Sequence, residues 1–135
     1  MFPLFLSRRD VFFSALAAHG LTPTHGIALM GLLGGPQRMS AMAGNMACDA
    51  SYITAVVDRL ESLGLASRRQ SDTDRRVREI VLTPKGRKVA ASLQETMATP
   101  PAEMAALSER EAVTLARILR KVQPAEPPSL VPRLA

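Results

Sequence analysis

The chain has 135 residues, of which 47% are hydrophobic, and a formal net charge of +5 at pH 7. This length and composition exclude a disordered or low-complexity chain and suffice for one basic globular domain with its own core. The single cysteine, Cys48, excludes an intrachain disulfide, and no apolar run approaches the roughly 20 residues needed to span a bilayer. We therefore expect a cytoplasmic protein that does not enter a membrane.

The first expected helix covers residues 3–18 and contains three of the chain's four phenylalanines. Arg8, Arg9 and Asp10 interrupt its apolar stretch, which is the wrong order of charges for a secretion signal. The helix has more apolar surface than one thin stripe, so we expect one part to be buried in the monomer and the rest against a second subunit. Burial wholly within its own subunit is the alternative.

The next elements lead into a helix-turn-helix pattern. Thr22 and Pro23 offer an N-cap and a first helical residue for a helix that extends to about residue 33. A Gly-Gly-Pro sequence at 34–36 then breaks the chain, and residues 37–39 could form a short strand. Ser40 is expected to cap a brief helix. Cys48 and Asp49 form the turn that follows, with Asp49 as the cap of the next helix.

The helix over residues 50–63 is the centre of the predicted fold. Its large apolar residues fall at helical spacing on one face, and the opposite face carries Ser51, Ala55, Asp58 and Ser62. Gly64 follows where a left-handed residue would end the helix, and residues 65–70 and 77–82 flank a polar tip as the strands of a hairpin would. The pattern predicts a mainly α fold with a small β-hairpin wing, a winged helix-turn-helix.

Two further helices are expected after the wing. Thr83 and Pro84 repeat the threonine-proline start for a helix that reaches about residue 97, before prolines at 100 and 101 end it. Ser108 and Glu111 form a capping box for a last helix, which carries apolar residues at helical spacing up to Val122. The proline-rich residues 124–135 are expected to form a frayed or extended tail.

The excess positive charge is local. Residues 68–88 contain eight basic and three acidic residues, a net charge of +5, while the rest of the chain holds nine of each. A basic patch beside a short helix with small polar residues is the electrostatic footprint expected of a module that binds duplex DNA. Solvated charge on an ordinary hairpin is the alternative interpretation.

Two stretches, CDASYITAVVDRLESLGLASRR and DRRVREIVLTPKGR, resemble the multiple antibiotic resistance regulator (MarR) family of bacterial winged-helix repressors. The resemblance covers residues 21–97 closely. Three motifs carry it: Asp58-Arg59-Leu60-Glu61 with Gly64-Leu65, then Asp74-Arg75-Arg76, then Leu82-Thr83-Pro84-Lys85-Gly86. Each motif is weak alone, but their order and spacing together are specific.

The resemblance implies one domain over residues 1–123, with a winged-helix core at about 21–98 and N- and C-terminal dimerisation helices at about 3–20 and 102–123. A homodimer of this type binds pseudo-palindromic duplex DNA, with recognition helices roughly 34 Å apart. Many members repress genes and leave DNA when a phenolic or similar small aromatic effector binds near the dimer interface. No other cofactor is implied.

Base contacts are expected from the first turns of the helix at residues 50–63, because its N-terminal side chains would enter the major groove. This nominates Ser51, Tyr52, Thr54 and Ala55. Arg59, further along, could contact a base, a backbone phosphate or a neighbouring carboxylate. Free N–H groups at the start of this helix would favour phosphate oxygen.

On the wing, Arg75 or Arg76 is expected to reach the minor groove. Asp74 would hold an arginine in a bidentate pair and fix the shape of the hairpin. Ser71 stands where the family often has an aspartate, with Asp72 next to it, which departs from the usual second wing salt bridge. Phosphate contacts are expected from four further basic residues: Arg38, Arg68, Arg69 and Lys85.

Other chemistry finds little support in the sequence. A role of Cys48 as an oxidation sensor is not favoured, because the neighbouring Asp49 would raise the pKa of its thiol. His19 and His25 show no metal-ligand spacing, and no nucleophile, base and orienting group occur together, so we expect no metal and no catalytic site. Two functions remain: a ligand-responsive transcriptional repressor, or a winged-helix module for protein association whose basic wing is a solvated surface.

Overall fold

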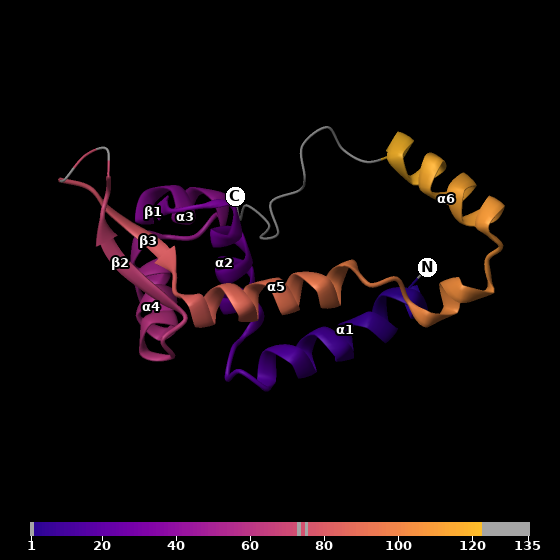
Figure 1. Ribbon diagram of the computed structural model, residues 1–135, viewed down its shortest axis with the longest axis horizontal. Coiled ribbons are helices and arrows are strands. Elements are labelled where there is room, and N and C mark those ends of the chain that lie inside the picture. Colours follow the sequence, from indigo (N-terminus) through magenta and orange to yellow (C-terminus); the bar gives the residue numbers. More distant parts are fainter. Residues whose placement is uncertain (1, 73, 75, 123–135) are drawn as a thin grey trace.

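The computed structural model describes residues 2–72, 74 and 76–122 and confirms the mainly α fold with a small sheet (Figure 1). Helices α1 (Phe2–Ala17) and α2 (Pro23–Gly31) are followed by the 3-10 turn η1 (Leu32–Gly34), strand β1 (Gln37–Arg38) and helices α3 (Met39–Asn45) and α4 (Ala50–Ser62). Strands β2 (Ala66–Gln70) and β3 (Arg78–Leu82) form the wing. Helix α5 (Pro84–Ala98), the 3-10 turn η2 (Ala102–Ala106) and helix α6 (Glu109–Val122) complete the chain.

The sheet has the strand order β1-β3-β2 and is antiparallel throughout. In the wing, Ala66 pairs with Leu82 and Gln70 with Arg78, so the hairpin is in register over the whole of β2. Strand β1 adds to the other edge of β3, where Gln37 pairs with Ile80. The short β1 thereby joins the helix-turn-helix to the wing.

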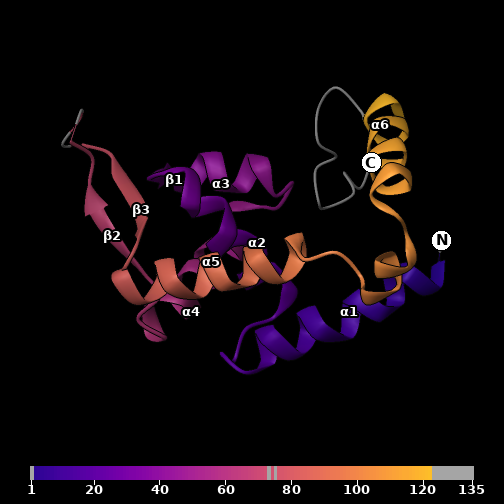
Figure 2. The ribbon, with the colours of Figure 1, turned by 45° about the vertical axis from the view of Figure 1, so that its right-hand side comes forward.

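The core lies where α2, α4, α5 and the base of the wing meet. The fully buried large side chains come from several elements, among them Leu29, Leu32, Ile53, Leu60, Ile80 and Leu93. Helix α1 runs beside α5 in both ribbon views and contributes Leu16 to this core (Figures 1 and 2). Helix α6 lies apart from the winged helix at the far end of α5, and none of its residues is buried. No described helix has the length and apolar character to cross a membrane.

Most predicted helix ends are confirmed, with one exception. Asp49 and Thr83 cap α4 and α5 through side chains that accept backbone N–H groups, and Gly64 has the left-handed φ of +68°. Ser108 and Glu111 form the expected capping box. The prediction that Ser40 caps the short helix is wrong, because α3 already starts at Met39 after the extended residue Arg38.

The end of α4 is tied to the start of α5 by contacts across the base of the wing. The Thr83 hydroxyl donates to the Gly64 carbonyl at 2.7 Å, and the Thr83 N–H donates to the Leu65 carbonyl at 3.1 Å. Gly86, in the first turn of α5, is buried against the same Leu65 carbonyl, where a Cβ would lie only 1.7 Å from the oxygen. The glycine of the Thr-Pro-Lys-Gly motif is therefore required by close backbone packing.

Replacing Gly86 by alanine is expected to lower the free energy of unfolding by about 3 kcal/mol, the upper end for overpacked sites, because backbone atoms must move to admit the methyl group. Gly44→Ala in α3 is the matched control: its Cβ would meet no described atom within 4 Å. That control should be neutral or stabilising by up to about 1 kcal/mol through reduced unfolded-state entropy. Urea denaturation of both variants checks the difference. Equal midpoints would contradict the close packing at Gly86.

The start of α2 depends on a histidine as a hydrogen-bond acceptor. The Thr22 N–H donates to Nδ1 of His25 at 3.2 Å, and the Thr22 hydroxyl lies 2.7 Å from the same nitrogen. Partial burial lowers the pKa of His25 below its ordinary value of 6.5, and the positive charge of Arg59 lowers it further. The neutral imidazole is thus the form that the folded chain prefers.

Acidification is therefore expected to destabilise the fold through His25. Its contribution is complete above pH 6.5 and declines as the pH falls through 6.5 towards the lowered folded value, because the unfolded chain then binds a proton that the folded chain does not. His25→Gln keeps an acceptor at this position but does not titrate. Between about pH 7.5 and about pH 5.5, the melting temperature of the parent should fall further than that of His25→Gln. Parallel losses would exclude His25 as the cause.

Candidate nucleic-acid interface

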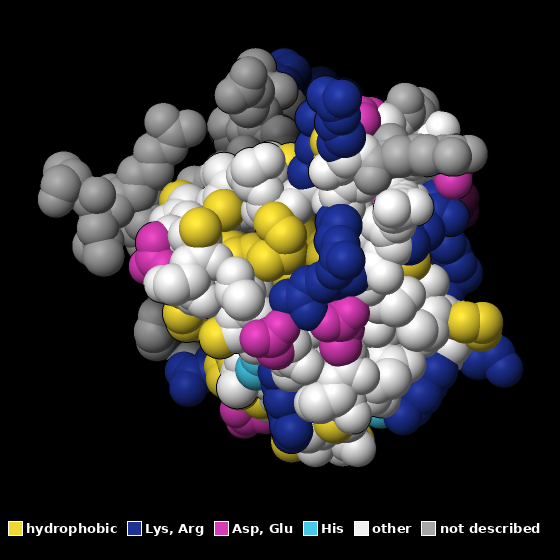
Figure 3. Space-filling model, turned by 90° about the vertical axis from the view of Figure 1, so that its left-hand side faces the viewer, with side chains coloured by type: hydrophobic (Ala, Val, Ile, Leu, Met, Phe, Trp, Pro, Cys, Tyr) yellow, Lys and Arg dark blue, Asp and Glu magenta, His cyan; other side chains and the backbone are white. Residues whose placement is uncertain are grey.

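Helix α4 separates cleanly into a buried and an exposed face. Ile53, Val56, Val57 and Leu60 are buried, whereas the side chains between them reach solvent. Figure 3 looks onto the end of the molecule that carries the wing and α4, and Lys and Arg side chains lie across this face with acidic side chains beside one of them. The predicted amphipathic helix therefore lies at the surface next to basic residues.

The predicted base-reading residues lie together on this surface. Ser51, Tyr52, Thr54 and Ala55 are all exposed in the first turns of α4. The Tyr52 hydroxyl donates to the Thr24 hydroxyl at 3.2 Å, which links α4 to α2. That these residues contact bases stays a prediction, but their placement leaves them accessible to a duplex.

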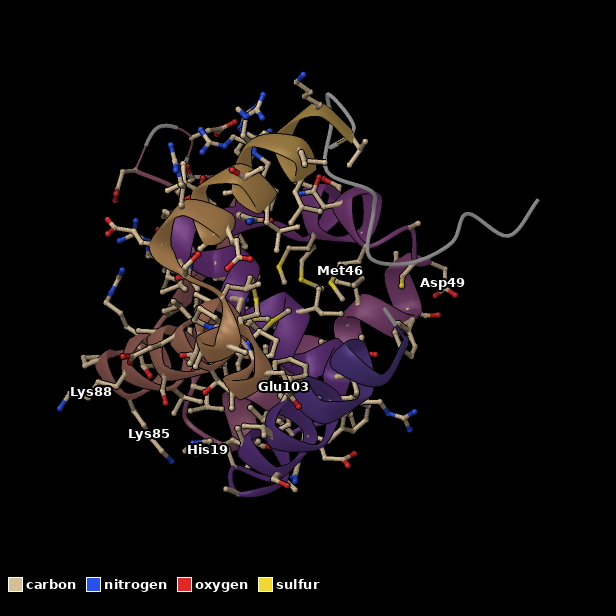
Figure 4. All side chains as sticks on the ribbon, turned by 90° about the vertical axis from the view of Figure 1, so that its right-hand side faces the viewer. His19, Met46, Asp49, Lys85, Lys88 and Glu103 are labelled. Atoms are coloured by element: carbon tan, nitrogen blue, oxygen red, sulfur yellow. The ribbon has the colours of Figure 1, made fainter. Side chains whose placement is uncertain are left out.

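The N-terminus of α4 differs from the expectation of free N–H groups. The carboxylate of Asp49 accepts the Tyr52 N–H at 2.8 Å and the Ser51 hydroxyl at 2.5 Å. The hydrogen bond from Ser51, followed by the one from the Tyr52 backbone, lowers the pKa of Asp49 below its usual value, so the group is ionised at neutral pH. Asp49 points outward at the edge of the molecule (Figure 4). A carboxylate thus occupies the position where we expected phosphate to be favoured.

Arg59 projects from the other end of the exposed face. One guanidinium nitrogen lies 3.5 Å from the Gly20 carbonyl, in the turn between α1 and α2. This long hydrogen bond is the contact that the structure gives Arg59, in place of a neighbouring carboxylate. A contact with a base or phosphate stays a prediction.

Arg68 of β2 connects the wing to α4. Its guanidinium donates to Glu61 through one terminal nitrogen and to Asp58 through the other, at 2.7 Å for Asp58. Its backbone N–H donates to the second oxygen of Glu61 at 2.8 Å. The Arg68 side chain is 24% exposed and that of Glu61 29%, so their charge-assisted bond is partly shielded from solvent, whereas Asp58 is 59% exposed. The structure gives Arg68 a positioning role that we did not anticipate, and the predicted phosphate contact stays untested.

Sequence reasoning missed this bridge although one signal for it was present. Asp58 and Glu61 are three residues apart and therefore share one side of α4. Which arginine they would meet depends on the angle at which β2 leaves the helix. That angle is set by tertiary packing, so no local pattern identified Arg68.

The tip of the wing is held by short-range contacts. Arg69 pairs with Asp72 at 3.1 Å, so Asp72 supplies an ion pair that Ser71 cannot. Ser71 is buried and its N–H donates to the Val77 carbonyl. Asp74 accepts the backbone N–H of Arg76 at 3.0 Å.

The structure describes one of the two wing arginines predicted to reach the minor groove. Arg75 lies outside the described residues, so its minor-groove role and its pairing with Asp74 stay predictions. Arg76 is exposed beside the tip, where such a contact is sterically open.

The remaining predicted phosphate-binding residues lie at the margins of this face. Arg38 is exposed in β1. Lys85 donates to the Leu63 carbonyl at 2.9 Å and so caps the C-terminus of α4. Figure 4 shows Lys85 and Lys88 pointing outward from α5. Contacts of Arg38 and Lys85 with phosphate stay predictions.

An apolar pocket of about 610 Å³ lies away from the basic face, between α1, α2, the end of α5 and η2. Its lining includes Phe12, Phe13, Ile27, Met30, Met97 and Met104. The guanidinium of Arg9 lies 5.3 Å from the ring centre of Phe13. A volume of this size and an apolar lining with few polar groups are typical of small-molecule sites.

The bridge at Arg68 is expected to stabilise the protein measurably. Arg68→Met keeps the aliphatic stem but removes the guanidinium, so the free energy of unfolding should fall by about 1.5 kcal/mol, as for other hydrogen bonds to charged groups. Arg69→Met is the matched control, because the Arg69–Asp72 pair is largely exposed and should change stability by less than about 0.5 kcal/mol. Urea denaturation measures both. Equal effects of the two substitutions would contradict the bridge.

Comparisons with known proteins indicate the same winged-helix fold and the same family as the sequence motifs. The model of the MarR family matches residues 34–77. The YusO protein from Bacillus subtilis is 29% identical over 92% of this chain and 89% of its own, with a TM-score of 0.71. A MarR family protein from Bacillus stearothermophilus is 26% identical over 85% of this chain and 81% of its own, with a TM-score of 0.73.

A third solved structure is the transcriptional repressor CouR bound to a 23-mer DNA duplex. It is 27% identical over 87% of this chain and 84% of its own, with a TM-score of 0.62. These matches confirm the resemblance seen in the Asp-Arg-Leu-Glu, Asp-Arg-Arg and Leu-Thr-Pro-Lys-Gly motifs. Residues 34–77 thus match the MarR family, and the chain has the fold of that family's winged-helix, DNA-binding transcriptional regulators, which are not enzymes.

Proposed function

We propose that this protein is a homodimeric repressor that binds a pseudo-palindromic duplex operator and leaves it when a small aromatic or phenolic ligand binds. The observation that carries the proposal is the exposed face of α4, with its small polar side chains, directly beside the basic wing. The bridge from Arg68 to Asp58 and Glu61 fixes these two elements relative to each other. A duplex can then contact both at once.

The DNA-bound form of CouR supports the choice of duplex DNA as the partner. The similarity to CouR extends over most of both chains. A repressor acts on chromosomal DNA, so we place the protein in the cytoplasm.

A homodimer is supported by apolar surface on the two terminal helices. In α6 the exposed residues include Val113, Ile118, Leu119 and Val122, and in α1 they include Val11 and Phe13. Apolar side chains on a helix that its own subunit does not bury need a partner surface. In a dimer that binds a pseudo-palindromic operator, we expect the two copies of α4 to lie about one DNA turn apart, roughly 34 Å.

The apolar pocket supports a ligand-responsive repressor. It lies between α1 and α5, which extend towards the proposed dimer contacts, and α2, which packs on α4. A ligand that fills this space would contact both parts of the subunit. Binding could therefore change the spacing of the two recognition helices and lower the affinity for the operator.

The wing arginines provide the test of this function. Arg75→Ala/Arg76→Ala should weaken binding to duplexes from the region upstream of the protein's own gene. The slope of log affinity against log salt should also fall by about 0.9 for each phosphate that the variant no longer neutralises. Gel-shift titrations at several salt concentrations measure both quantities. Arg120→Ala/Lys121→Ala removes the same charge from α6 and is the control, with sedimentation to verify that the dimer persists.

Two results would decide against the proposal. Unchanged affinity and slope in the wing variant would exclude the placement of the wing on DNA. Purification of the parent with a protein partner, but without salt-sensitive duplex binding, would favour a winged-helix module for protein association instead.

A further inference from the structure

Three hydroxyl groups of α4 have their protons committed within the protein. The Ser51 hydroxyl lies 2.5 Å from the Asp49 carboxylate, the Thr54 hydroxyl 2.8 Å from the Ala50 carbonyl, and the Ser62 hydroxyl 2.8 Å from the Arg59 carbonyl. Each of these partners is an acceptor without a hydrogen of its own, so each hydroxyl must donate. What remains for another molecule is the lone-pair side of each oxygen.

The rest of the exposed face has the same character. Asp49 and Asp58 carry carboxylates that only accept hydrogen bonds, and Ala55 offers only a methyl group. Two other exposed side chains of α4 can donate: Arg59, which lies to one side of the face, near the turn between α1 and α2, and Tyr52, whose hydroxyl donates to the Thr24 hydroxyl. The centre of the face is therefore a surface of acceptors and methyl groups.

The major groove offers a complementary set of groups. Its hydrogen-bond donors are the exocyclic amino groups of adenine N6 and cytosine N4, whereas guanine presents the acceptors N7 and O6. A hydroxyl oxygen whose proton is already donated within the protein can still accept a hydrogen bond from an amino group. It cannot bond to N7 or O6 of guanine, because both atoms then present lone pairs and neither has a hydrogen to donate. Reversing this would require Ser51 or Thr54 to break its bond to the protein.

We infer that α4 reads adenine and cytosine through their exocyclic amino groups, with Ser51 and Thr54 as acceptors, and that only Arg59 is suited to guanine. This inference rests on the proposed function, because it requires α4 to enter the major groove. It adds which atoms of the bases are read and which residues determine the specificity. The Thr54 methyl group and Ala55 remain available for the thymine methyl group.

The experiment starts with selection of a binding sequence from a random duplex library by the parent protein. Single bases in one half-site of the selected duplex are then replaced. Nebularine in place of adenine, or 2-pyrimidinone in place of cytosine, removes the amino group. A 7-deaza purine removes N7 and leaves the amino group in place.

At one or more positions, loss of the amino group should weaken binding by about 3- to 10-fold, the value of one hydrogen bond. Thr54→Val or Ser51→Ala should abolish that sensitivity, so the protein and base changes would not add. Removal of N7 from any adenine that shows this loss should leave the affinity unchanged. A loss of affinity on removing guanine N7 should disappear only in Arg59→Ala.

Stability controls keep the result interpretable. Thr114 in α6 makes the same kind of bond as Thr54, from its hydroxyl to the Arg110 carbonyl at 2.8 Å. Thr114→Val and Thr54→Val should therefore change the melting temperature equally. Should Ser51→Ala fail to fold, Thr54→Val alone carries the test.

The possible failures are distinct. Enrichment of no duplex sequence would overturn the proposed function and the inference with it. Enrichment of a sequence whose affinity depends on N7 or O6 in a way that Ser51→Ala or Thr54→Val removes would overturn the inference alone, since the hydroxyls would then be donors. Indifference to every amino group in the half-site would also overturn it.

Discussion

The structure depends on the closure of the carbonyl end of α4 by the first residues of α5. The carbonyls of Leu63, Gly64 and Leu65 accept hydrogen bonds from Lys85 and Thr83. Gly86 allows the backbones to meet without a side chain between them. Because the wing is the segment between these two points, its base is fixed on both strands, and its direction relative to α4 follows from this junction.

The bridge at Arg68 acts one step further along the wing. Two carboxylates on one side of α4 bind the guanidinium and the backbone of β2, so the hairpin cannot rotate away from the helix without separating charges that are partly shielded from water. The exposed face of α4 and the arginines of the wing are thereby held as one surface. Acidic residues that would repel a polyanion in isolation serve here to orient basic ones.

The same local chemistry shapes the recognition surface. Short hydroxyl side chains on a helix readily bond to a carbonyl one turn earlier or to the capping residue. In α4 this consumes the donor capacity of Ser51, Thr54 and Ser62 and leaves an accepting surface. Because these hydroxyls have no proton left to donate, the surface favours the amino groups of bases over acceptors such as guanine N7 and O6.

The sequence by itself determined the elements that depend on near neighbours along the chain. The apolar spacing of α4, the left-handed Gly64 and the caps at Asp49, Thr83 and Ser108 are governed by interactions within about one helical turn, so periodicity and residue type predicted them. The same kind of local pattern predicted the two strands of the wing. The exception at Ser40 arose because Arg38 is extended within a strand, which moved the helix start to Met39.

Only the tertiary structure decided how the charged and polar side chains are used. Arg68 meets carboxylates, Lys85 meets the carbonyl of Leu63, and Arg59 reaches the turn after α1. These partners are 7 to 39 positions apart in the chain. Hydrogen bonds form only over about 3 Å, so each pairing depends on where the packed core places separate elements, which no local pattern of residues encodes.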